Sequence, residues 1–134
     1  SCPSFNELAR DGQDVERWNL LHPDDKKPRV AFVTSQLEPH AGPAIASTDY
    51  MKNYAEQIRA FIPKGRTYKV LGTDGFGRSD FRSELRKHFE VNRHYVVIAA
   101  LKALAEDGSI PATKVGEAIK KYGIDAGKIN PLYA

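Results

Sequence analysis

The chain has 134 residues, of which 41% are apolar and 28% are charged, and its formal net charge is +3. This length suits one domain with a hydrophobic core, and the composition excludes an intrinsically disordered chain. Acidic and basic residues are interspersed, so we expect neither a nucleic-acid nor a membrane partner. The lone Cys2 cannot form an internal disulfide, and no apolar run reaches the roughly 18 residues of a membrane-spanning helix. A cytoplasmic location is therefore expected.

The N-terminal part is predicted to be helical. Ser4 and Glu7 have the spacing of a capping box, which opens a helix. We expect Gly12 to interrupt or bend this helix before its apolar spacing resumes up to Leu21. Residues 29–37 have an ambiguous pattern that favours a short helix over a strand.

An alternation of strands and helices is predicted next. Residues 44–47 form a short buried strand, and Thr48 or Asp49 caps the helix that follows it. A second strand covers residues 67–71. The helix between the two strands is expected to have an apolar face made of Tyr50, Met51, Tyr54, Ile58 and Phe61.

The rest of the chain is organised around the glycine-dense stretch after the second strand. Glycines permit positive φ and the close approach of another backbone, and the first turn of the next helix presents free N–H groups. That helix has Phe81, Leu85 and Phe89 on one face, and Ser79 or Asp80 is an ordinary N-cap for it. The candidate site residues are Asp74, Gly75, Phe76, Gly77, Arg78, Ser79 and Asp80, preceded by Gly72 and Thr73.

The glycine spacing does not identify a nucleotide site. Its order, G-x-x-G-x-G, is not that of the dinucleotide fingerprint, and no Gly-Lys-Ser/Thr completes a P-loop. Three glycines in such a loop can also serve only to turn the chain. Of these alternatives, a packed or interfacial loop is favoured over a ligand site.

Two further helices are expected in the C-terminal part. Asn92 caps the first, and its side chains over residues 95–105 are apolar almost all round, so it should be largely buried or pack against a second surface. Gly108 ends it. The last helix carries the apolar residues of 115–122, and residues 124–134 form a tail.

The predicted strands and helices indicate an α/β fold with parallel pairing, because parallel strands need crossover helices and this chain supplies them. Two or three strands make a poor sheet for this many helices. The chain also starts without an initiator Met and runs almost directly into a helix. We therefore interpret it as a piece of a longer protein, whose upstream βαβ start would complete the sheet.

No self-contained active site is evident. The four histidines, His22, His40, His88 and His94, lack the spacing of metal ligands and are interpreted as structural. No serine or cysteine has a nucleophile signature. The acidic pairs at residues 24–25 and 106–107 are interpreted as solvated charge. The residues alone thus predict an interaction or assembly domain.

Longer stretches of the chain resemble a known family. Residues 5–23 (FNELARDGQDVERWNLLHP), 46–52 (ASTDYMK), 71–80 (LGTDGFGRSD) and 124–131 (IDAGKINP) are similar to the homodimeric bacterial pyruvate dehydrogenases, the decarboxylating components of the pyruvate dehydrogenase complex. The resemblance covers nearly the whole chain. The combination of motifs is specific, whereas the glycine stretch alone is also similar to that of transketolases.

This resemblance implies that residues 1–134 are the third, C-terminal domain of a longer enzyme. The implied fold is the transketolase C-terminal type, a three-layer α/β/α sandwich over a mixed, mostly parallel sheet, here lacking its first strand and helix. The parent enzymes decarboxylate pyruvate with thiamine diphosphate and Mg²⁺, then reductively acetylate the lipoyl group of dihydrolipoyl acetyltransferase. In that family the two preceding domains bind the cofactors, so we assign no catalytic, cofactor-binding or metal-binding residue to this chain.

The resemblance also implies the role of this segment, which is domain packing and dimer assembly in a multienzyme complex. Its partners would be its own N-terminal and middle domains, the second subunit of a homodimer and dihydrolipoyl acetyltransferase. The isolated segment is expected to be inactive. Two alternatives stay open: a free-standing module that binds an anion or a peptide at the 72–80 loop, and the same domain of another 2-oxo acid dehydrogenase or of a transketolase.

Overall fold

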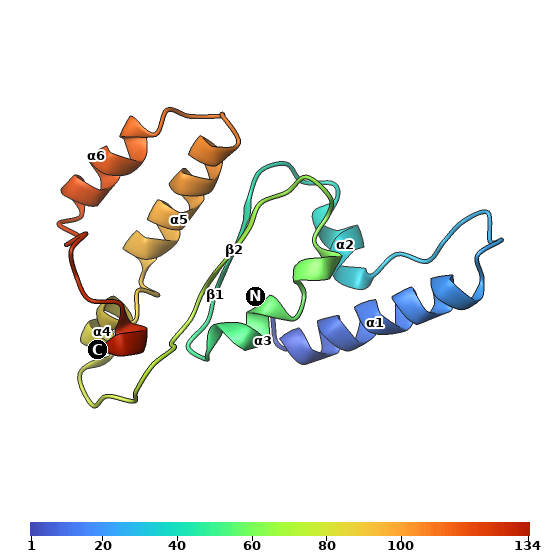
Figure 1. The fold of residues 1–134 in the computed structure, drawn as a ribbon, viewed down its shortest axis with the longest axis horizontal. Helices are drawn as coiled ribbons and strands as arrows, with labels where there is room; N and C mark the ends of the chain where they lie inside the picture. Colours follow the sequence, from blue (N-terminus) through green and yellow to red (C-terminus); the bar gives the residue numbers. More distant parts are fainter. The chain divides into compact units, whose positions relative to one another are not determined.

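In the computed structural model, all residues from 1 to 134 are described, and they form two compact units (Figure 1). Unit 1 comprises Ser1–Ala41 and Asn53–Arg66, and unit 2 comprises Gly42–Lys52 and Thr67–Ala134. The α/β class and the parallel pairing of the strands are confirmed. The elements in chain order are α1 (Phe5–Leu21), α2 (Phe32–Leu37), β1 (Ala44–Ser47), α3 (Lys52–Glu56), the 3₁₀ helix η1 (Arg59–Phe61), β2 (Tyr68–Leu71), α4 (Arg82–His88), α5 (Arg93–Glu106), α6 (Thr113–Lys121) and the 3₁₀ helix η2 (Pro131–Tyr133).

Unit 1 is built around the long helix α1. Ser4 caps this helix as predicted, with its Oγ accepting the N–H of Glu7 at 3.2 Å. Contrary to the prediction, the helix runs through Gly12 without interruption. Gly12 is buried because the ring of Phe61 lies against it, and a Cβ atom at this position would be 2.5 Å from that ring. The glycine therefore serves close packing between α1 and η1 instead of breaking the helix.

The predicted short helix within residues 29–37 is confirmed as α2, which packs beside α1. Its first N–H, that of Phe32, is accepted by Asp11 Oδ2 of α1 at 2.6 Å. Thr34 Oγ1 donates to the carbonyl oxygen of Phe61 and ties α2 to η1. The buried apolar side chains of unit 1 are Ala9, Ala31, Val33, Ala55, Ile58 and Phe61.

The helix expected after residue 48 is shorter and begins later than predicted. The carbonyl oxygens of Asp49 and Tyr50 accept hydrogen bonds from Thr73, at 2.6 Å from its Oγ1 and 2.9 Å from its backbone N. These two residues are therefore bound to the loop after β2 and do not enter the helix. α3 begins at Lys52, and η1 follows as a separate turn. Of the predicted apolar face, Ile58 and Phe61 are buried, whereas Tyr50, Met51 and Tyr54 are exposed.

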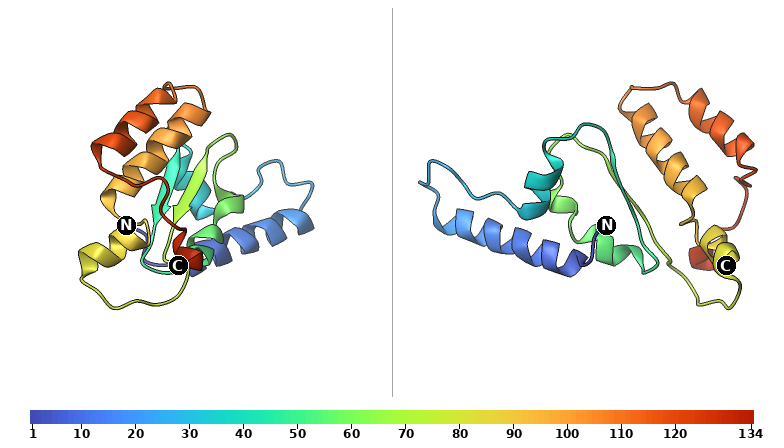
Figure 2. Two further views of the ribbon diagram at one scale, coloured as in Figure 1. Left: turned by 60° about the vertical axis from the view of Figure 1, so that its left-hand side comes forward. Right: turned by 180° about the vertical axis from the view of Figure 1, so that it is seen from behind.

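Unit 2 is built on the parallel pair of β1 and β2, which are in register over their full length. The bounds of both strands agree with the prediction to within one residue. α5 contacts both strands and α6 contacts α5, so the layers of this unit run from α6 through α5 to the strands (Figure 2). The position of α5 between two neighbours explains why its sequence is apolar almost all round.

The ends of the helices in unit 2 agree with the prediction in one case and differ in another. Asn92 caps α5, because its Oδ1 accepts the N–H groups of the first helical turn at 3.0 and 3.1 Å. At α4, however, the N-cap is Phe81, and no side chain caps the first turn. Phe81 is 82% exposed, so the predicted apolar face of α4 loses its first member, while Leu85 and Phe89 are half-buried. None of the helices in either unit has the length and apolar character required to cross a membrane.

Candidate interaction site at the glycine loop

The glycine loop, residues 72–80, leaves β2 at the carboxyl end of the parallel pair, where ligands most often bind in α/β folds. Its first residue, Gly72, is buried against the turn that precedes α3. A Cβ atom at this position would be 2.8 Å from the carbonyl oxygen of Tyr50 and 2.8 Å from the backbone N of Lys52. Only glycine allows the two backbones to approach this closely.

Asp74 fixes the base of the loop. Its Oδ1 accepts the N–H of Lys52 at 3.0 Å, and its Oδ2 lies 3.9 Å from Lys52 Nζ. A carboxylate at the start of a helix satisfies a free N–H group and complements the helix dipole. The structure thus gives this predicted site residue a capping contact with α3.

Gly75 is the point at which the C-terminal segment meets the loop. Its φ is +112°, a value that L side chains rarely adopt. A Cβ atom there would overlap the carbonyl oxygen of Pro131 and lie 3.1 Å from its carbonyl carbon. Pro131 is itself buried, so the loop packs against η2 at this residue.

The tip of the loop, by contrast, is open to solvent. Residues 76–80 are all exposed, and the ring of Phe76 is 77% exposed. The guanidinium of Arg78 makes no hydrogen bond or ion pair. The C-terminal segment that packs on the loop also exposes apolar side chains. We define the loop surface as Phe76, Arg78, Phe81, Leu132 and Tyr133, of which the four apolar members are exposed. Exposed apolar side chains on adjoining segments are typical of interaction surfaces.

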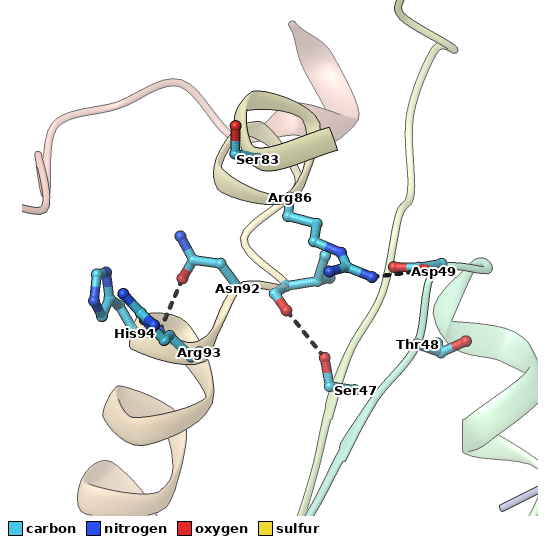
Figure 3. A pocket seen from close by; sticks show the side chains of 9 residues that line it. Ser47, Thr48, Asp49, Ser83, Arg86, Asn92, Arg93 and His94 are labelled. Carbon is cyan, nitrogen blue, oxygen red and sulfur yellow. Dashed lines mark hydrogen bonds and ion pairs between the residues drawn. The ribbon is translucent and has the colours of Figure 1, made fainter. Parts of the chain in front are cut away.

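Two hollows share the residues Asp49 and Arg86, and one of the two adjoins the loop. One, of about 330 Å³, lies between the loop and α4 and has a largely apolar lining that includes Phe76 and Phe89. The other, of about 600 Å³, lies where β1 ends and α5 begins (Figure 3). Asp49 and Arg86 line both hollows and form an ion pair at 3.4 Å.

The larger hollow is basic and polar. Arg86 points to Asp49, Arg93 has no partner, and Ser47 Oγ donates to the carbonyl oxygen of Val91 at 3.3 Å (Figure 3). Its one carboxylate is ion-paired, so these residues do not fit a Mg²⁺–diphosphate group, which requires free oxygen ligands. Among the described residues there is no group of three or more His, Cys, Asp or Glu that could hold a metal ion.

A third hollow, of about 510 Å³, lies on the other side of the loop residues Arg78 to Asp80 and includes His88 of α4. The Nε2 atom of His88 is buried without a hydrogen-bond partner. Burial lowers the pKa of His88 from its ordinary value, and the nearby charges of Arg78 and Lys128 lower it further, while Glu90 opposes them. Lys128 Nζ donates to the carbonyl oxygen of His88 at 2.7 Å and lies 3.2 Å from Glu90 Oε1.

Sequence reasoning located the loop but missed the groups across from it. Arg86 and Arg93, from α4 and α5, carry no motif. Asp49, which follows β1, was noted only as a candidate cap and as part of the 46–52 stretch. One feature of the sequence could have indicated this hollow. Asp49 closely follows a predicted strand, and the carboxyl end of that strand lies beside the carboxyl end of the next strand.

Comparison with known proteins assigns the family. Residues 1–92 match the family described as the transketolase-like TK C-terminal domain. The chain belongs to this family. The match of the transketolase-like C-terminal domain includes both strands and the whole glycine loop.

Individual relatives of this transketolase-like domain are much longer than the chain. It is 63% identical over 132 residues to the pyruvate dehydrogenase E1 component of Pseudomonas aeruginosa, which covers 98% of this chain and 15% of that protein. The identity is 60% over 131 residues to that of Cupriavidus necator, covering 98% of this chain and 14% of the relative. It is 56% over 134 residues to that of Escherichia coli K12, covering 100% of this chain and 15% of the relative. The resemblance inferred from the sequence motifs is confirmed.

Proposed function

We propose that this chain is the C-terminal domain of a pyruvate dehydrogenase E1 component. The observation that carries the proposal is an identity of 56% to 63% with bacterial proteins of that name over 98% to 100% of this chain. The whole enzyme would decarboxylate pyruvate with thiamine diphosphate and Mg²⁺ and reductively acetylate the lipoyl group of dihydrolipoyl acetyltransferase, in the cytoplasm. The high identity over nearly the whole chain favours this enzyme over another 2-oxo acid dehydrogenase or a transketolase.

Within that enzyme, the chain would serve assembly and not chemistry. In the hollow of Figure 3, Ser47 donates to a backbone carbonyl and not to a base, and Asp49 is held by Arg86. A nucleophile needs an adjacent general base, and a diphosphate-bound metal needs free carboxylates. The cofactors would therefore be held by other parts of the polypeptide.

The loop residues Asp74 to Asp80 are the proposed contact in this assembly. The base of the loop is anchored, by Asp74 to Lys52 and by the approach of Gly75 to Pro131. The tip presents Phe76 and Arg78 without partners. Phenylalanine and arginine are both enriched in protein interfaces relative to the rest of the surface. Their partner would be a preceding domain or the second subunit of a homodimer.

The contact is tested by Phe76→Ala and Arg78→Ala in the full-length protein. Each substitution should raise the dimer dissociation constant, measured by analytical ultracentrifugation, by about tenfold or more. Lys121→Ala, at an exposed position at the end of α6, is the control and should leave dimerisation unchanged. Dimers of both loop variants that are as stable as the control would exclude the loop from the subunit contact.

The enzyme assignment is tested separately by the intact mass of the source protein and its sequence upstream of Ser1. We expect a chain of many hundred residues that contains a thiamine diphosphate motif. A chain without such a motif would remove the assignment.

A second function, anion binding by a free-standing module, is favoured by one observation, which lies outside the 72–80 loop where such binding was expected: Arg93 has no partner and lines a hollow beside Arg86. Titration of the protein with inorganic phosphate, followed by NMR, tests this alternative. Saturable shifts at the N-terminal turn of α5 would support it, and the absence of shifts at millimolar phosphate would remove it.

A further inference from the structure

The segment before α2 forms a stiff ridge along α1 in unit 1. The side chain of Asn19 holds the backbone of Arg29 at two points, with Nδ2 donating to its carbonyl oxygen and Oδ1 accepting its N–H, both at 2.9 Å. Further along, the N–H of Phe32 is held by Asp11 at 2.6 Å. Asn19 and Asp11 are separated by about two turns of helix, roughly 12 Å. Residues 29–32 therefore run extended along α1 and are fixed at both ends.

The side chain of Arg29 is also fixed. Its guanidinium carbon lies 3.4 Å from the centroid of the Trp18 ring. The ring of His22 stacks on Trp18 at 3.9 Å with an interplanar angle of 8°. Both groups cannot occupy one face at these distances, so Trp18 is held between them. His22 Nδ1 donates to the carbonyl oxygen of Trp18 at 2.9 Å, which locks the stack.

The guanidinium of Arg29 nevertheless makes no hydrogen bond or ion pair of its own. Its N–H groups are fixed in orientation and unpaired. A planar guanidinium matches the two oxygens of a carboxylate, and fixing it before binding removes part of the entropic penalty of forming that pair. Arg29 is thus a preorganised receptor for a carboxylate.

Two large apolar side chains next to this arginine in the same extended segment are exposed, Val30 by 54% and Phe32 by 56%. Ala31, between these two, is only 5% exposed, so the extended segment directs Val30 and Phe32 away from α1. We call Arg29, Val30 and Phe32 the ridge surface. Arginine and phenylalanine are both enriched in protein interfaces relative to the rest of the surface.

From this geometry we propose that the ridge surface docks onto a part of the same polypeptide upstream of residue 1, with Arg29 pairing with an Asp or Glu carboxylate flanked by apolar side chains. The proposal rests on the proposed function, because this chain spans only 14% to 15% of its long relatives. Within residues 24–29, Asp24 and Asp25 balance Lys26 and Lys27, which leaves the one positive charge of Arg29 for an acidic partner group. The ridge surface belongs to unit 1, whereas the loop surface belongs to unit 2.

The test replaces the guanidinium of Arg29 with a reactive amine. Arg29→Lys in the full-length protein is treated with a carbodiimide, which joins an amine to a contacting carboxylate without a spacer. The matched control is Arg17→Lys, on the neighbouring helix α1, exposed and without a partner. We expect the peptide with position 29 to be linked to an Asp or Glu upstream of residue 1, at a yield at least about tenfold that of position 17. Adding Phe32→Ala should reduce this yield by about threefold or more.

Mixed dimers of isotope-labelled and unlabelled subunits identify the source of the carboxylate. Links only within one isotope type support docking in the same polypeptide. Links between isotope types, links confined to residues 1–134, or a yield equal to that of the control would overturn the proposal. The outcome is independent of the enzyme assignment: an upstream link in a protein that does not turn over pyruvate would remove the proposed function and leave the docking surface intact.

Discussion

Replacing Gly75 with alanine tests how the loop is held. At a φ of +112°, a residue with a side chain is strained by about 1–3 kcal/mol. The new Cβ would also overlap the carbonyl oxygen of Pro131. Because this neighbour is backbone, no side-chain rotation relieves the overlap, and η2 must move. Alanine restricts the unfolded chain, which offsets only about 0.4–1 kcal/mol. We expect a net local destabilisation of about 1–2 kcal/mol or more.

Hydrogen exchange resolved by peptide in the full-length protein measures this effect. The N–H of Tyr133, bonded to the carbonyl oxygen of Asn130 at 2.9 Å, reports on η2. Its exchange should accelerate about tenfold for each 1.4 kcal/mol. Gly77→Ala is the control, since no atom lies within 4 Å of its added Cβ. Equal exchange in the two variants would refute the reasoning that the contact of Gly75 with Pro131 holds the C-terminal segment.

Further predictions concern packing and pH. Gly12→Ala should destabilise α1 in hydrogen exchange, because the added Cβ would be 2.5 Å from the ring of Phe61, whereas Gly116→Ala in α6 meets nothing within 4 Å and should stabilise its helix by about 1 kcal/mol. A stabilised α1 in the Gly12 variant would contradict the packing. The pKa of His88 is lowered below its ordinary value of 6.5, so the unfolded chain takes up the proton first and the stability of unit 2 should fall as the pH falls below about 6.5. His88→Gln should make hydrogen exchange in α4 less dependent on pH. An unchanged dependence of this exchange on pH would contradict the assignment of the effect to His88.

The sequence predicted the parts of the fold that depend on neighbouring residues. The caps Ser4 and Asn92 bond within three residues, and both strands are short apolar runs between turn residues. Such signals are local and can be recognised in one sequence.

The errors came from contacts between distant residues. Gly12 was expected to disturb its helix, but the ring of Phe61 occupies the space that its missing Cβ leaves. Asp49 was a candidate cap for the next helix, but its carbonyl oxygen is bound by Thr73 from the loop after β2. Neither contact can be recognised from the residues next to Gly12 or Asp49 in the sequence, because tertiary contacts override local preference.

The candidate site, too, was predicted only in part. The glycines marked the loop, and the close approach at Gly72 and Gly75 is the property for which glycine was expected there. The hollow of Figure 3 could not be predicted, since Asp49 and Arg86 come together only when β1 and α4 are placed.

The central claim is that this chain is part of a pyruvate-decarboxylating enzyme. Its most direct test is an assay of the purified full-length protein for reductive acetylation of a lipoyl domain from pyruvate, with and without thiamine diphosphate and Mg²⁺. The account predicts acetylation that requires pyruvate and both cofactors. A full-length protein that binds thiamine diphosphate but acts on a different 2-oxo acid, or one that shows no turnover with both cofactors present, would contradict it.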